Sequence, residues 1–158
     1  MGLIERNKWA AYMETGSGES AVYTLMGEGF KDLSENKNPK EYTRQYVHER
    51  TERSDVTGYA PQIAYSVDAY SDNAVITKII EVTDQEKTGA DAVVSIVSVN
   101  LFDGSDGSYT AYKRNYAIIP NSKGSGTDAL IYTGNLKAQG DAVAGTFATA
   151  TNTFTAAA

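Results

Sequence analysis

The chain carries few residues whose type and spacing could support catalysis. His48 is its only histidine, and it lies in a stretch with Tyr42, Arg44 and Tyr46 that shows no triad-like pattern. Because there is no cysteine, a thiol nucleophile and a cysteine-based zinc site are both excluded. Paired carboxylates for glycoside hydrolysis come together only in space, so the 20 acidic residues single out no pair. We therefore expect no enzymatic activity, no cofactor and no metal site.

Three loops resemble ligand-binding motifs only loosely. The segment 103–107 has two aspartates and two glycines, but Ser105 and Gly107 stand where a calcium loop needs Asp or Asn. The Gly-rich segments 15–20 and 123–128 lack the Gly-Lys-Ser/Thr ending of a phosphate-binding loop. All three are therefore predicted to be turns.

Composition places the chain among globular proteins and argues against nucleic-acid and membrane binding. Its length of 158 residues is typical of a single domain, and 41% of the residues are apolar. The net charge of −6 and pI of about 4.8 oppose a surface that grips DNA, although such charge is also ordinary for a soluble bacterial protein. No apolar run approaches the roughly 20 residues of a membrane span, and no signal peptide is evident. We expect a soluble protein made in the cytoplasm.

Short strand-like runs dominate the sequence, with one helix in the middle. The helix is predicted at about residues 73–85, capped by Ser71-Asp72 and ended by Thr88-Gly89. Its apolar stripe requires a sheet to pack on. The fold class that follows is mainly β, a sandwich or barrel with one flanking helix in a single domain, 1–158. The predicted strands are Lys8–Met13, Ala21–Met26, Phe30–Ser34, Ile63–Ala69, Ala92–Phe102, Ser108–Ile119 and Ala129–Lys137.

A long segment between the third and fourth predicted strands lacks a core of its own. Residues 37–58 begin with alternating side chains, so that Tyr42, Arg44, Tyr46 and His48 fall on one face of a predicted strand. Neither face is apolar enough to be a core face, and the stretch that follows is charged. We predict an extended arm or loop that leaves the body of the domain, and such segments are usually functional.

The C-terminal segment raises a different problem. Residues 142–158 are rich in Ala, Thr and Phe, and after Asp141 none carries a charged side chain. The predicted terminal strand, at about residues 144–155, would promote aggregation if it were a free edge. It is therefore expected to be buried in the sheet or covered by a neighbouring subunit.

The order of these pieces resembles the major tail proteins, or tail tube proteins, of long-tailed phages. A passage with two glycines and Asp-Leu is present at 25–33, and an Asn-Pro arm with Tyr-Val follows at 38–47. The arm returns through a Tyr-Ala-Pro passage at 58–63, and a Gly-Thr-Phe-Ala-Thr strand lies at 145–149. Together these passages span nearly the whole chain.

The resemblance implies a structural subunit of the virion tail, assembled in the host cytoplasm. Hexameric rings would stack into a tube that conducts DNA during ejection without sequence-specific binding. Implied partners are further copies of the chain, the tape-measure, tail-tip initiator and tail-terminator proteins, and tail assembly chaperones. The arm would contact a neighbouring subunit or ring. The candidate contact residues are Tyr42, Arg44, Tyr46, His48, Arg50 and Arg53.

Two alternatives remain open at the level of sequence. The same fold serves the inner tube of a contractile tail or tailocin. A monomeric β-sandwich that binds carbohydrate would instead use some of the 11 tyrosines in a concave groove. The second alternative predicts a concave aromatic surface and no self-assembly.

Overall fold

The computed structural model describes residues 2–15, 22–105, 107–124 and 126–157. Within them, strands predominate and a single α-helix, α1, lies between β6 and β7. The elements are η1 (Arg6–Lys8), β1 (Trp9–Glu14), β2 (Tyr23–Leu25), β3 (Phe30–Asn36), β4 (Pro39–Arg44), β5 (Arg53–Tyr59), β6 (Gln62–Asp68), α1 (Ala74–Asp84), η2 (Gly89–Ala92), β7 (Val93–Ser105), β8 (Ser108–Lys123), β9 (Ile131–Ala148) and β10 (Thr153–Ala156).

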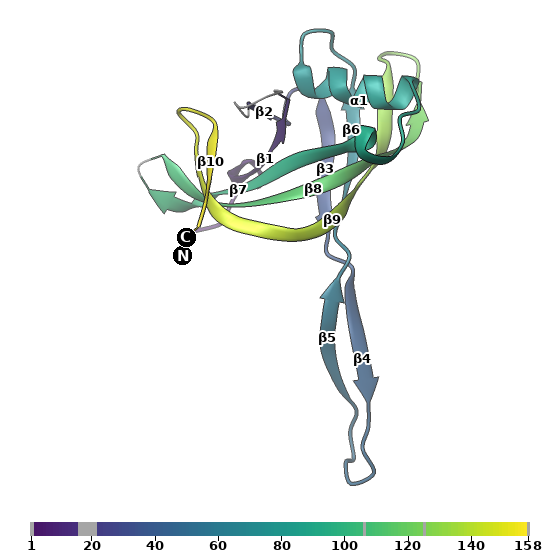
Figure 1. The fold of residues 1–158 in the computed structure, drawn as a ribbon, viewed down its shortest axis with the longest axis vertical. Helices are drawn as coiled ribbons and strands as arrows, with labels where there is room; N and C mark the ends of the chain where they lie inside the picture. The colour runs from purple at the N-terminus through teal and green to yellow at the C-terminus, as the bar shows by residue number, and fades with distance from the viewer. Residues whose placement is uncertain (1, 16–21, 106, 125, 158) are drawn as a thin grey trace.

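The main sheet is antiparallel and strongly curved. Its strands follow the order β2-β1-β7-β8-β9-β6-β3, and β10 pairs with the far end of β9. The central strands β7, β8 and β9 are long enough, at 13, 16 and 18 residues, to bend into a half-barrel (Figure 1). The predicted fold class, a mainly β sandwich or barrel with one helix and an extended arm, is confirmed.

Helix α1 packs on one half of the concave face of this sheet. Its buried side chains Val75, Ile76, Ile79 and Val82 form the apolar stripe and join one core cluster with strand residues such as Leu136. Asn73 caps the helix, because its Oδ1 accepts hydrogen bonds from the backbone N–H groups of Val75 and Ile76 at 2.9 and 3.3 Å. The predicted cap at Ser71-Asp72 is therefore wrong by one or two residues.

A second, smaller core cluster lies on the opposite face of the sheet. It contains Tyr12, Tyr23 and Phe147, whose rings pack together, and Val97 and Val99 of β7. The centroids of Tyr12 and Phe147 are 4.4 Å apart. Val94 and Ile96 of the same strand belong to the first cluster. Successive side chains of β7 therefore point to opposite faces of the sheet and contribute to both clusters.

The arm is an antiparallel hairpin that continues the β3–β6 pair away from the sheet (Figure 1). It consists of β4 and β5, paired from Pro39↔Tyr59 to Arg44↔Arg53. The strand predicted to carry Tyr46 and His48 ends at Arg44, so these two residues lie in the connection between β4 and β5. The predicted alternation beyond Arg44 is therefore wrong.

Three further predicted segments match the structure to different degrees. β1 and β2 form the predicted hairpin, although its turn, residues 16–20, lies outside the described residues. β8 extends past the predicted end at Ile119 to Lys123. The terminal strand predicted at about 144–155 is wrong, because β9 runs without a break through Ala148 and a separate short strand, β10, folds back on it.

Candidate assembly arm and concave cavity

The outer end of the arm is organised around Tyr46. The Arg44 guanidinium lies 4.8 Å from the ring centroid of Tyr42 and 5.8 Å from that of Tyr46, and Arg53 lies 5.4 Å from the Tyr46 ring. Arg44 Nε also donates to the Tyr46 hydroxyl at 3.2 Å, and His48 stacks nearly parallel on Tyr46 at 6.5 Å. Tyr46 thus holds cationic and aromatic groups from both sides of the hairpin together.

Two ion pairs reinforce this cluster. Arg44 pairs with Asp55 at 2.6 Å, and Arg53 donates through Nε and Nη2 to Glu49 Oε2 at 3.0 and 2.8 Å. Hydrogen bonds to Tyr46 and to Asp55 raise the pKa of Arg44 above its ordinary value. The other carboxylate oxygen, Glu49 Oε1, is buried and has no partner among the described residues.

The structure brings together five of the six predicted contact residues. Those five form the cluster just described, whereas Arg50 is exposed between β4 and β5 and enters none of the described ion pairs. Their suggested role in assembly stays a prediction.

The arm buries almost nothing of its own. Neither core cluster includes a residue between Lys37 and Ala60. Tyr42, Val47 and Tyr59 are exposed, and the side chain of Val47 has no cover at all. At its base the arm is joined to the sheet by hydrogen bonds, including one of 3.0 Å from Asn38 Nδ2 to the carbonyl oxygen of Ala60. A two-stranded ribbon of this kind is only marginally stable in water without a partner surface.

The arm and the rest of the chain differ in charge. Within 39–59 there are four cationic and four acidic side chains, so the net charge of −6 lies outside the arm. An electrically neutral arm can approach the acidic body of a second copy without net repulsion.

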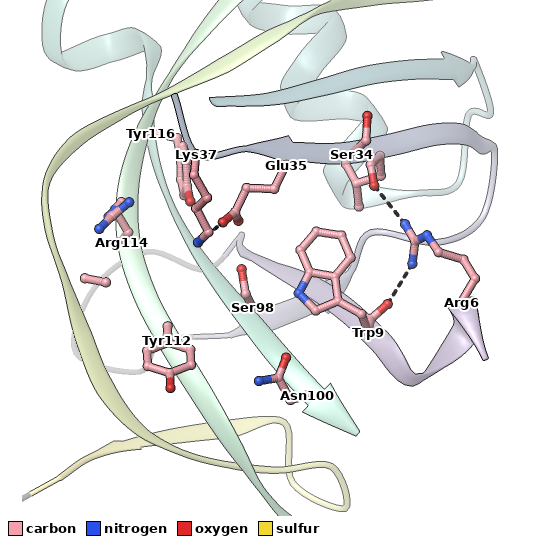
Figure 2. Close-up of a pocket in the computed structure, with 12 residues that line it drawn as sticks. Arg6, Trp9, Ser34, Glu35, Lys37, Ser98, Asn100, Tyr112, Arg114 and Tyr116 are labelled. Atoms are coloured by element: carbon pink, nitrogen blue, oxygen red, sulfur yellow. Dashed lines mark hydrogen bonds and ion pairs between the residues drawn. The ribbon is translucent and has the colours of Figure 1, made fainter. Parts of the chain in front are cut away.

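A second candidate site is the part of the concave face that α1 leaves open. It forms a cavity of about 540 Å³, whose polar and aromatic lining comes from η1, β1, β3, β7 and β8 (Figure 2). No sequence pattern pointed to this cavity, since its residues are spread from Arg6 to Ala142 and only the strand order brings them together. The polar and aromatic lining residues include Arg6, Trp9, Glu35, Lys37, Ser98, Asn100, Tyr112, Arg114 and Tyr116.

Arg6 closes one side of the cavity. Its guanidinium donates to the carbonyl oxygen of Trp9 at 2.9 Å and to that of Leu33 at 2.8 Å, and it lies 5.0 Å from the Trp9 ring centroid. It therefore bridges β1 and β3, which do not pair with each other in the sheet (Figure 2).

Two further features are absent from the residues described: a group of side chains that could hold a metal ion, and a helix that could span a membrane. In the ranges given above, no three His, Cys, Asp or Glu side chains are grouped to hold a metal ion. The described part of the chain also contains no helix long and apolar enough to cross a membrane.

Comparison with known proteins gives a likeness of fold. No protein-family model matches the sequence, and no curated protein is significantly similar to it. Among solved structures, a chain of the anti-feeding prophage baseplate, determined by cryo-EM and six-fold symmetrised, matches with a TM-score of 0.51. The match covers 91% of this chain and 95% of that chain at 11% sequence identity, so it shows a shared fold.

Proposed function

We propose that this chain is a structural subunit of a phage tail or phage-derived tail particle, without catalytic activity. Copies would assemble into hexameric rings that stack into a tube for DNA. The shared fold supports the tail-associated role, since the similar chain belongs to a six-fold symmetrised prophage baseplate and is matched over almost its whole length. The tape-measure, initiator, terminator and chaperone proteins belong to the same proposal as partners.

The observation that carries the assembly proposal is the projecting arm. A hairpin with exposed Tyr42, Val47 and Tyr59 and no core residue has a surface available for a partner. Stacking through an arm that reaches a different surface of the next copy is a head-to-tail contact, and such contacts form rings or open filaments.

The proposed tube also agrees with the charge of the body. An excess of acidic groups outside the arm would repel phosphates, so DNA would pass along a lumen of these surfaces without adhering to it. A second candidate follows from the source of the similar chain, which is a baseplate. The subunit would then form a ring in a baseplate, or the inner tube of a contractile tail or tailocin.

The test replaces Pro39–Tyr59 with two glycines. Since the arm adds nothing to the core, the variant should keep its sheet and helix and remain monomeric, whereas the intact protein forms rings or tubes under the same conditions. Gly58→Ala is the matched control for folding: its Cβ meets no atom within 4 Å in the subunit, so the hairpin should keep its structure. Sedimentation velocity and negative-stain electron microscopy give the readout, and normal tubes from the armless variant would reject the arm's role.

A further inference from the structure

The concave face of the sheet is divided into two chemically different halves. Under α1 the inward side chains are apolar, for example Ile96 of β7 and Ile118 of β8. Beyond the helix, the same alternation along β7 and β8 places Ser98 and Tyr112 on that face, opposite each other in register. The uncovered half is therefore a polar and aromatic hollow within an otherwise apolar concave surface.

The hollow contains one buried hydrogen-bond donor that has no partner among the described residues. Arg114 Nε is buried and makes no hydrogen bond within the described residues. Ser98 is only 8% exposed, and neither its hydroxyl nor the Trp9 indole N–H takes part in a side-chain hydrogen bond in the described parts of the chain. A buried donor such as Arg114 Nε stays unsatisfied only at a cost in free energy, so it favours a ligand that offers an acceptor atom.

The charges around the hollow oppose the charge of the whole molecule. Arg6 of η1, Lys37 just after β3 and Arg114 of β8 line it, and Glu35 is the one acidic lining residue. Lys37 and Glu35 pair with each other, which leaves the two arginines as the local excess (Figure 2). In a chain with a net charge of −6, this cavity is a place where an anionic group is attracted.

Aromatic side chains form the walls between which a ligand would lie. The Trp9 indole and the Tyr112 ring project into the cavity from β1 and β8, with Ser98 and Asn100 of β7 between them (Figure 2). The volume of about 540 Å³ falls in the range of small-molecule sites and far exceeds the roughly 30 Å³ of one water molecule. A single small anion would leave most of it unfilled.

We propose that this cavity binds an acidic saccharide, a pyranose ring that carries a carboxylate. The carboxylate accepts from Arg114, the ring lies against Trp9 and Tyr112, and its hydroxyls bond Ser98 and Asn100. Burial raises the pKa of Tyr116 to about 12, with the nearby Glu35 charge adding to the effect and Arg114 opposing it. This inference does not depend on the proposed ring assembly, since one subunit contains every residue involved.

The test is an NMR titration of the isotope-labelled full chain with digalacturonate. We expect the Trp9 indole N–H and backbone signals of β7 and β8 to shift, with a dissociation constant of about 1 mM or lower. Arg114→Gln should weaken binding by about tenfold or more, because it removes a charge-assisted hydrogen bond. Arg50→Gln makes the same change of charge on the arm and should leave binding unchanged.

Neutral digalactose and acetate separate the parts of the proposal. Both should bind much more weakly than digalacturonate. If digalactose binds as tightly as digalacturonate, the cationic side chains do not select for the carboxylate. If acetate binds as tightly, the cavity is a simple anion site without a preference for a saccharide. If Arg114→Gln lowers thermal stability, Tyr112→Ala takes its place, since that ring is 44% exposed and its loss leaves both core clusters intact. An absence of shifts in the cavity would overturn the proposal.

Discussion

Gly145 provides a sharp test of how the C-terminal strand is held. A Cβ at this position would lie 2.2 Å from the carbonyl oxygen of Thr155, 2.8 Å from Phe154 Cζ and 3.0 Å from Ala156 Cα, all on β10. Real Cβ atoms do not approach backbone oxygen this closely, so Gly145→Ala must displace β10. The rest of the sheet, including Phe147 on β9, can stay in place.

The size of the effect follows from what β10 contributes. Overpacking typically costs about 1–3 kcal/mol. Complete release of β10 would set the upper limit of the lost stability. The main apolar contact of β10 is the half-buried Phe154, and full burial of a Phe contributes only about 1.5–3 kcal/mol. Lost strand hydrogen bonds are largely offset by the conformational entropy regained. We therefore expect the free energy of unfolding to fall by about 1–2 kcal/mol.

Urea unfolding followed by the fluorescence of Trp9, the only tryptophan, measures the global change. Hydrogen exchange should show lost protection in β10 while β8 and the first half of β9 keep theirs. Gly58→Ala serves as the control, since it meets no atom, and its stability should stay within about 0.5 kcal/mol of the parent. Unchanged protection of β10 in Gly145→Ala would refute the packing described.

The remaining predictions concern the helix and the pH dependence of stability. Ile79→Ala should cost about 2–5 kcal/mol in urea unfolding, because Ile79 is fully buried between α1 and the sheet, and a loss below about 1 kcal/mol would contradict that packing. Lys123 hydrogen-bonds Asp84 at 2.8 Å and lowers the pKa of that carboxyl below its ordinary 3.8. The resulting stability is present above about pH 4 and is lost as the pH falls through the lowered pKa of the folded state. Asp84→Asn should therefore be less stable than the parent at neutral pH, with the difference vanishing in acid, and an equal difference at all pH values would contradict this.

Local patterns in the sequence account for the helix and for the arm. The stripe of Val75, Ile76 and Ile79 repeats at helical spacing, and only its cap was misplaced, since Ser71, Asp72 and Asn73 are all good capping residues. The arm was predictable because residues 37–58 offer no apolar face. Its hairpin geometry was not, since the connection between β4 and β5 is charged and aromatic, without a Gly-rich turn signal.

The long strand β9 shows where local patterns mislead. Gly140 and Asp141 lie between the two strands predicted at 129–137 and at about 144–155. In the structure Gly140 takes a φ of +82°, and the register against β8 shifts between Lys113 and Asn115, so the strand passes through a bulge and continues. The cavity was beyond prediction for a related reason: Trp9 and Tyr112 become neighbours on one face only through the strand order.

The most direct test of the proposed function is electron microscopy of the purified protein at high concentration, with preformed tail fragments added as seeds in a parallel sample. We expect six-fold rings or hollow tubes in the seeded sample, because the exposed arm offers the proposed contact between subunits. A protein that stays monomeric at every concentration and fails to extend the seeds would contradict the account.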